Sequence, residues 1–221
     1  MNRLADAMEP YLTANTIRFN RNTPQMTAAS SIAQANQGEY DFYLALHSNA
    51  AGSGNAGEAR GIIAFYYPTS TNGKRAAELF AKNLRTIYPL PNLVATRSTT
   101  SLGEVRQPKA PANLLELGYH DNVEDARWIE DNIQLIAQNL VLSLTEYFSL
   151  PFSYPEGPLP AVVATASGGN LNLRAYPSTD SAVVAQMPDG ANVTVYAQRQ
   201  GWYTVGYGDQ LGYAAAAYIQ I

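Results

Sequence analysis

The chain has 221 residues, of which 46% are hydrophobic and 14% are charged, and its formal net charge is −4. This length and apolar content allow a sizeable core, in one large domain or two modest ones. The sparse charge offers no basic surface for nucleic acid and no polybasic stretch for a membrane. The absence of cysteine excludes disulfides, thiolate metal sites and cysteine catalysis. No run approaches ~18 consecutive apolar residues, so we expect no membrane insertion, and no signal peptide is visible at the N-terminus.

Helical and strand patterns alternate from residue 1 to residue 148. Apolar residues at helical spacing, Leu4, Met8 and Leu12 among them, open the chain without a preceding N-cap, and Pro10 lies inside this pattern. The predicted strands lie at residues 16–20, 40–47, 61–67, 92–96 and 112–118, and the further predicted helices at residues 27–37, 71–88, 122–129 and 132–148. Strands that alternate with helices predict an α/β fold, in which a mostly parallel sheet carries helices on both faces.

The composition changes after this α/β region. Residues 150–161 are rich in proline, which predicts a semi-rigid linker. Short alternating segments separated by turn signals follow at residues 171–174, 182–187, 191–197, 202–207 and 211–214. Their spacing predicts a small, closed all-β barrel. We therefore expect an α/β domain at residues 1–149, the linker, and an all-β domain at residues 162–221.

Two of the predicted strands carry a chemically reactive side chain. His47 ends one strand, and Glu116 lies among three leucines in a later one. Ligands bind at the C-terminal strand ends of open α/β sheets, and neutral imidazole is the commonest metal ligand. A carboxyl group among leucines is desolvated, which raises its pKa and suits acid or base work near neutral pH. The sequence also allows plainer roles: a hydrogen-bonded structural histidine, and a glutamate that pairs with Arg106 or points to solvent.

The segments around these two residues resemble the zinc-dependent N-acetylmuramoyl-L-alanine amidases, which cleave peptidoglycan. That family has a strand that ends in Ser/Ala-Leu-His-x-Asn-Ala, matched here by residues 45–50 (ALHSNA). Its later segment Pro-Ala-x-Leu-x-Glu-x-Gly-Phe/Tyr-x-Ser/Asp-Asn is matched by residues 111–122 (PANLLELGYHDN), and the Asp that follows it by Asp125. Both motifs occur in the family's order, and the resemblance covers about residues 1–148.

The resemblance implies that His47 is a zinc ligand and that Glu116 is the catalytic glutamate. In such a site zinc lowers the pKa of a bound water and polarises the scissile carbonyl, while the carboxylate carries a proton to the leaving amine. The family also has a histidine in a Gly-His-Gly segment after its first strand and a glutamate at the start of its first helix, and this sequence matches neither. We therefore expect the chain to be N-terminally truncated, with the family's first strand missing. We also expect it to bind zinc weakly or not at all, because one histidine cannot make the usual three-ligand site.

Three residues in or near the motifs are candidates for substrate binding. Asn49 belongs to the first motif, and Arg106 precedes the second. The guanidinium of Arg106 could steer a substrate carboxylate or pair with Glu104. His120 leaves the strand of the second motif, and we favour a place for it at the rim near substrate over a role as a metal ligand.

Residues 162–221 resemble a bacterial SH3-like domain. The matching segments are residues 170–174 (NLNLR), 177–179 (PST), 201–203 (GWY) and 212–213 (GY). This resemblance implies binding to cell-wall peptide or glycan through an aromatic surface. The candidate wall-binding residues are Tyr176, Trp202, Tyr203 and Tyr213. The same rings could instead only fill or cover a small barrel.

The sequence thus favours a secreted or cell-wall-associated peptidoglycan hydrolase, which we expect to be a monomer. Zinc-activated water would cleave the amide between N-acetylmuramic acid and L-alanine, and the SH3-like domain would tether the enzyme to its insoluble substrate. Two alternatives stay open. One is a non-catalytic cell-wall-binding protein, an amidase relic that lacks the upstream metal ligands. The other is a zinc carboxypeptidase, which shares the general chemistry of the site.

Overall fold

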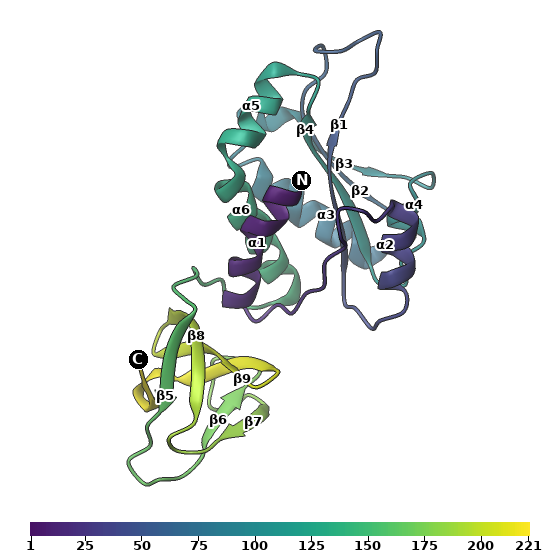
Figure 1. Ribbon diagram of the computed structural model, residues 1–221. Coiled ribbons are helices and arrows are strands. Elements are labelled where there is room, and N and C mark those ends of the chain that lie inside the picture. The colour runs from purple at the N-terminus through teal and green to yellow at the C-terminus, as the bar shows by residue number, and fades with distance from the viewer. The chain divides into compact units, whose positions relative to one another are not determined.

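The computed structural model describes residues 1–221, which form two compact units (Figure 1). The first unit comprises Met1–Met8 and Arg21–Phe148, and the second comprises Glu9–Asn20 and Ser149–Ile221. The first unit ends where the proline-rich stretch begins. None of the helices combines the length and apolar character that crossing a bilayer requires. The residues of the first helix are divided between the two units.

The helices occur where the apolar periodicity predicts them. Thr27 caps α2 through a capping box with Ser30, and Ser70 caps α3 by accepting a hydrogen bond from the backbone N–H of Gly73. The helices are α1 (Asn2–Ala14), α2 (Ala28–Ala35), α3 (Thr71–Leu84), α4 (Gly103–Arg106), α5 (Val123–Asp131) and α6 (Ile133–Phe148). Only the single-turn helix α4 is absent from the sequence prediction.

The first unit contains a mixed four-stranded sheet in the order β1-β4-β2-β3. Its strands are β1 (Tyr43–Asn49), β2 (Ile62–Tyr66), β3 (Val94–Ser98) and β4 (Ala112–Tyr119). The pairs β1–β4 and β2–β3 are parallel, but β2 runs antiparallel to β4, so the sheet is less uniformly parallel than predicted. The reason lies between β1 and β2. A parallel return needs a crossover, usually a helix, whereas residues 50–61 form a loop that brings the chain back in the opposite direction.

Helices cover both faces of this sheet, as predicted. In Figure 1, α3, α5 and α6 lie on one side and α2 and α4 on the other. The second side carries a small apolar cluster in which Ala45 of β1 and Leu114 of β4 pack against Val105 of α4. This side is the face that matters for the candidate site.

The prediction of a strand at residues 16–20 is wrong. Helix α1 ends in a tight turn instead, in which Thr16 has a left-handed φ of 59° and the N–H of Ile17 donates to the carbonyl oxygen of Leu12 at 2.9 Å. The segment that follows pairs with no strand. Alternation of residue types alone cannot make a strand without a neighbour that accepts its backbone hydrogen bonds.

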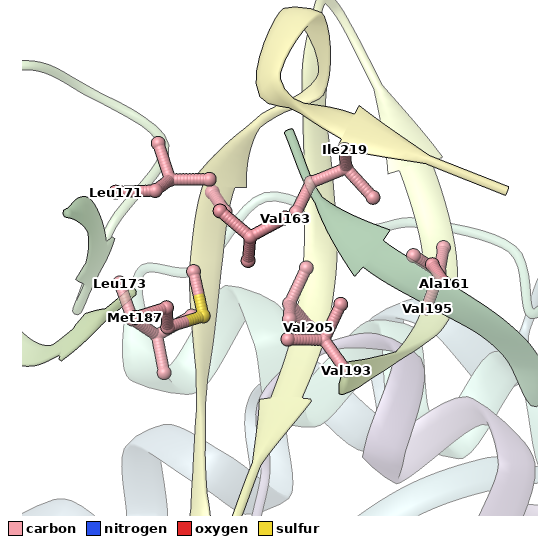
Figure 2. Packing of buried hydrophobic residues seen from close by; sticks show 10 residues of the cluster. Ala161, Val163, Leu171, Leu173, Met187, Val193, Val195, Val205 and Ile219 are labelled. Carbon is pink, nitrogen blue, oxygen red and sulfur yellow. The ribbon is translucent and has the colours of Figure 1, made fainter. Parts of the chain in front are cut away.

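The second unit contains one antiparallel sheet of seven strands, in the order β11-β5-β8-β9-β10-β6-β7. The strands are β5 (Leu159–Val163), β6 (Leu171–Arg174), β7 (Val183–Met187), β8 (Asn192–Arg199), β9 (Trp202–Tyr207), β10 (Gln210–Ala215) and β11 (Ile219–Gln220). Figure 2 shows side chains from several of these strands, among them Leu173, Met187 and Val205, directed into one apolar core. Strand β5 begins inside the stretch that the sequence predicts to be linker. The all-β organisation is the one expected of an SH3-like domain.

Residues 9–20 are an integral part of the second unit. The side chain of Asn15 is buried and forms two hydrogen bonds with the backbone of Ser153, donating to its carbonyl oxygen at 2.9 Å and accepting from its N–H at 2.6 Å. The hydroxyl of Thr204 on β9 donates to the carbonyl oxygen of Ala14 at 2.8 Å. The ring of Tyr11 stacks on that of Phe152, with centroids 6.4 Å apart. These contacts fix a segment that is far away in the sequence onto the all-β unit.

We predict that Asn15→Ala destabilises the second unit by about 2 kcal/mol, because it leaves a buried backbone N–H and C=O of Ser153 unpaired. Hydrogen exchange of the whole chain should show lost protection around residue 153 and in β9. Asn55→Ala, in an exposed loop, is the matched control. Equal protection in both variants would mean that residues 9–20 do not support the sheet.

Candidate active site

His47 and Glu116 lie side by side on the sheet. They are register partners in the parallel pair β1–β4, and Ile63 of β2 stands opposite Glu116 on its other side. Alternation along the strands places both side chains on the same face as Ala45 and Leu114, which is the face covered by α4. Strand β1 ends at Asn49 and β4 at Tyr119, so both residues stand near the C-terminal ends of their strands. The structure thus brings His47 and Glu116 together, as the sequence predicts.

Glu116 is half-buried and keeps one oxygen without a partner. Its Oε2 atom is shielded from solvent and takes part in no hydrogen bond. Burial raises the pKa of Glu116. The charge of Glu104 also raises this pKa, whereas the charges of His47 and His120 lower it. A carboxyl group with a raised pKa and an unengaged oxygen is suited to accept and return a proton.

Glu104 is the site residue that the sequence analysis missed. Its Oε2 lies 3.0 Å from Nε2 of His47, and its Oε1 accepts a hydrogen bond from the hydroxyl of Tyr43 at 3.3 Å. The bond to Glu104 raises the pKa of His47, against the lowering effect of burial. The available signal was a lone acid between Leu102 and Val105, two apolar residues that pack on the sheet. Its partner is therefore His47 and not Arg106, which the sequence suggested.

The three predicted substrate-binding residues are placed differently. His120 is exposed beside the end of β1, with Nδ1 3.1 Å from both the hydroxyl and the carbonyl oxygen of Ser48. The side chain of Asn49 accepts a hydrogen bond from the N–H of Ala50 at 2.9 Å and so shapes its own loop. Arg106 is exposed on α4, two residues beyond Glu104. His120 and Asn49 thus share the strand-end region with His47.

Asp125 of α5 fixes the backbone around the end of β4. Its buried carboxylate accepts hydrogen bonds from Nε of Arg60 and the hydroxyl of Tyr88, at 2.9 and 2.6 Å. It also accepts from the backbone N–H groups of Gly61 and Tyr119, at 3.0 and 3.1 Å. The start of β2 and the end of β4 are therefore held by one fully satisfied carboxylate.

The residues of the site do not make up a metal centre by themselves. No group of three or more His, Cys, Asp or Glu side chains is arranged to hold a metal ion. Nε2 of His47 is already engaged by Glu104, and a catalytic zinc site needs three protein ligands. His47, Glu104 and Glu116 lie close together, but they are not arranged to hold one ion between them.

The aromatic candidates in the second unit divide by exposure. Tyr176 is 43% exposed, and Trp202 and Tyr203 of β9 are partly buried. Tyr213 of β10 is only 2% exposed, and its hydroxyl accepts a hydrogen bond from that of Thr16 at 3.4 Å. A buried ring offers no free face for stacking, so Tyr213 supports the sheet from within, and Tyr176 is the most accessible of the four predicted rings.

Comparisons with known families match both parts of the chain. The family described as N-acetylmuramoyl-L-alanine amidase matches residues 1–146, and the family described as bacterial SH3 domain matches residues 169–220. The probable cell wall amidase LytH of Staphylococcus aureus is 32% identical over 111 residues, which cover 49% of this chain and 36% of that protein. The match thus spans about a third of the length of the curated relatives.

Solved structures show the same fold. The catalytic domain of CwlV, an N-acetylmuramoyl-L-alanine amidase from Bacillus (Paenibacillus) polymyxa var. colistinus, has a TM-score of 0.54 at 22% identity, over 67% of this chain and 82% of that one. An N-acetylmuramoyl-L-alanine amidase from Clostridium difficile 630 has a TM-score of 0.57 at 18% identity, over 66% of this chain and 81% of that one. At these identities the likeness establishes the fold of the first unit alone.

We predict that the chain of residues 1–221 shows no saturable one-to-one zinc binding at micromolar metal, because no three of its His, Asp or Glu side chains are arranged to hold one ion. Isothermal titration calorimetry of the metal-stripped protein measures this directly. Tight, stoichiometric binding that is lost in His47→Asn would contradict the prediction.

Proposed function

Because the chain belongs to the N-acetylmuramoyl-L-alanine amidase family, we propose that it acts on peptidoglycan by hydrolysing the amide between N-acetylmuramic acid and L-alanine. The observation that supports this most is the parallel register that pairs His47 with Glu116 at one strand edge. We further propose that residues 1–149 form the catalytic part and residues 162–221 the part that holds the enzyme to the wall.

In the proposed reaction, Glu116 is the proton carrier. Its carboxylate takes a proton from the water whose oxygen attacks the lactyl carbonyl carbon. The carbon–nitrogen bond then breaks, and Glu116 returns the proton to the departing amine of L-alanine. The raised pKa of Glu116 favours both halves of this exchange, because the group can hold the proton between attack and departure.

Zinc is the metal that the family resemblance implies. When bound, it would make the attacking water more acidic and polarise the carbonyl. His47 is the residue of this chain that corresponds to a zinc ligand. Further ligands would be needed beyond those that the described residues provide, so we assign the steps above to Glu116 and leave the metal outside them.

The match of the second unit to bacterial SH3 domains supports a wall-binding role for it. We propose that Tyr176, Trp202 and Tyr203 contact uncharged parts of peptidoglycan by stacking and hydrogen bonding. Tethering of this kind raises the local concentration of an insoluble substrate. We accordingly propose that the protein acts outside the cell or in the wall.

A second candidate function is wall binding without catalysis. The observation in its favour is the incomplete donor set around His47. The coding sequence upstream of Met1 helps to separate the two candidates. A Gly-His-Gly strand end and a glutamate ahead of α1 would favour the enzyme. A start codon at Met1 would favour the non-catalytic wall-binding protein. A carboxypeptidase would be recognised by peptides with a new C-terminus and an intact lactyl amide.

We predict that Glu116→Gln lowers the release of L-alanine N-termini from purified muropeptides by about 100-fold or more, because the proton carrier is lost. Mass spectrometry of the products, with end-group labelling, measures the rate. Glu146→Gln, which removes a carboxylate paired with Lys82 on an exposed surface, should keep the full rate. Activity retained in Glu116→Gln would remove this residue from its assigned role.

We predict that Tyr176→Ala weakens co-sedimentation of the protein with insoluble peptidoglycan several-fold, because an accessible ring is lost. Tyr218→Ala, at a comparably exposed tyrosine in the same unit, is the matched control. Unchanged sedimentation of the Tyr176 variant would contradict the assignment of this ring. Strong sedimentation together with no alanine release would favour the non-catalytic candidate.

A further inference from the structure

We propose that Glu104 is a positioning residue: its carboxylate holds the imidazole of His47 by Nε2 and leaves Nδ1 as the ring nitrogen available to the reaction. This inference rests on the proposed function. It adds a residue that lies outside both sequence motifs and that supports the catalytic face from a separate helix.

The contact between Glu104 and His47 is short, and the carboxylate is the more buried of the two partners. Nε2 of His47 is 3.0 Å from Oε2 of Glu104, and the two side chains are 41% and 14% exposed, respectively. Because an ionised carboxylate only accepts hydrogen bonds, Nε2 must carry the proton in this pair. The other nitrogen of a neutral ring then carries the lone pair.

The second oxygen of Glu104 is also engaged. The hydroxyl of Tyr43 donates to Oε1 at 3.3 Å, so both carboxylate oxygens have partners from the same strand. Tyr43 and His47 are both on β1 and share one face of it. The carboxylate therefore bridges two side chains of β1 and cannot turn without losing one of them.

Helix α4 is fixed to the sheet well enough to serve this purpose. Val105 is buried against Ala45 and Leu114, and Leu102 packs on the same cluster. Glu104 lies between these two anchors in the chain, which limits its movement relative to β1. Without Glu104, this histidine, which is 41% exposed, would have no side-chain hydrogen bond to set its orientation.

The two carboxylates beside His47 have different surroundings, which separates their roles. Glu104 uses both oxygens in hydrogen bonds, whereas Oε2 of Glu116 is buried without a partner. A satisfied carboxylate is suited to hold a ring in place, and carboxylate–histidine pairs do this at many metal and acid–base sites. An unsatisfied carboxyl group is suited to exchange a proton with substrate.

Proton and nitrogen NMR of the histidine-labelled whole chain tests this inference. The chain has only two histidines, so their signals are easily separated. We expect a slowly exchanging, low-field Nε2–H signal from His47 in the unsubstituted protein. It should disappear in Glu104→Ala, move toward its usual position in Tyr43→Phe, and stay unchanged in the matched surface control Glu146→Gln.

Kinetics on the same variants complete the test. We expect Glu104→Ala to lower kcat by roughly 10–100-fold with little change in KM, as for loss of other partners that orient a functional histidine. A low-field signal that persists in folded Glu104→Ala would overturn the inference, as would loss of the signal with an unchanged kcat. Absence of alanine release by the unsubstituted protein would instead contradict the proposed function, which the NMR result does not depend on.

Discussion

The parallel register of β1 with β4 is the constraint on which the candidate site depends. From Tyr43 opposite Ala112 to His47 opposite Glu116, each residue of β1 has one partner on β4. A shift of one residue would send either His47 or Glu116 to the opposite face of the sheet. The apolar partners along these strands, Ala45 and Leu114 among them, make such a shift costly because they would leave the cluster under α4. Packing beneath the site thus determines the chemistry at its edge.

The surroundings of this pair assign a separate task to each charged group. Asp125 binds the backbone at the end of β4 and has every oxygen satisfied. Glu104 binds His47 through one oxygen, whereas Oε2 of Glu116 is buried without a hydrogen-bond partner. A single polar side chain has a similar role in the second unit. Asn15 forms hydrogen bonds with both backbone groups of Ser153 and so holds residues 9–20 against the sheet. In both units, single polar side chains connect segments that apolar packing alone would not fix.

Much of this architecture could be predicted from the sequence, because it depends on local patterns. The apolar periodicity of the helices and the two motifs with His47 and Glu116 were readable directly. The strand predicted at residues 16–20 was wrong because pairing depends on a distant partner. Glu104 was missed because a single-turn helix has too few residues to show a period. Tyr213 is buried and bonded to Thr16, almost the whole chain away, and no local pattern could show this contact.

The family assignment and the geometry point to the same strand edge, while the donor set there leaves room for a protein that binds the wall without cutting it. Hydrolysis requires that His47 and Glu116 lie on one face of the sheet, whereas wall binding through the second unit does not. The most direct measurement is the set of backbone NOEs between β1 and β4 in the labelled protein. We expect contacts that pair His47 with Glu116. Contacts that pair His47 with Leu115 or Leu117 would place the two side chains on opposite faces and contradict this expectation.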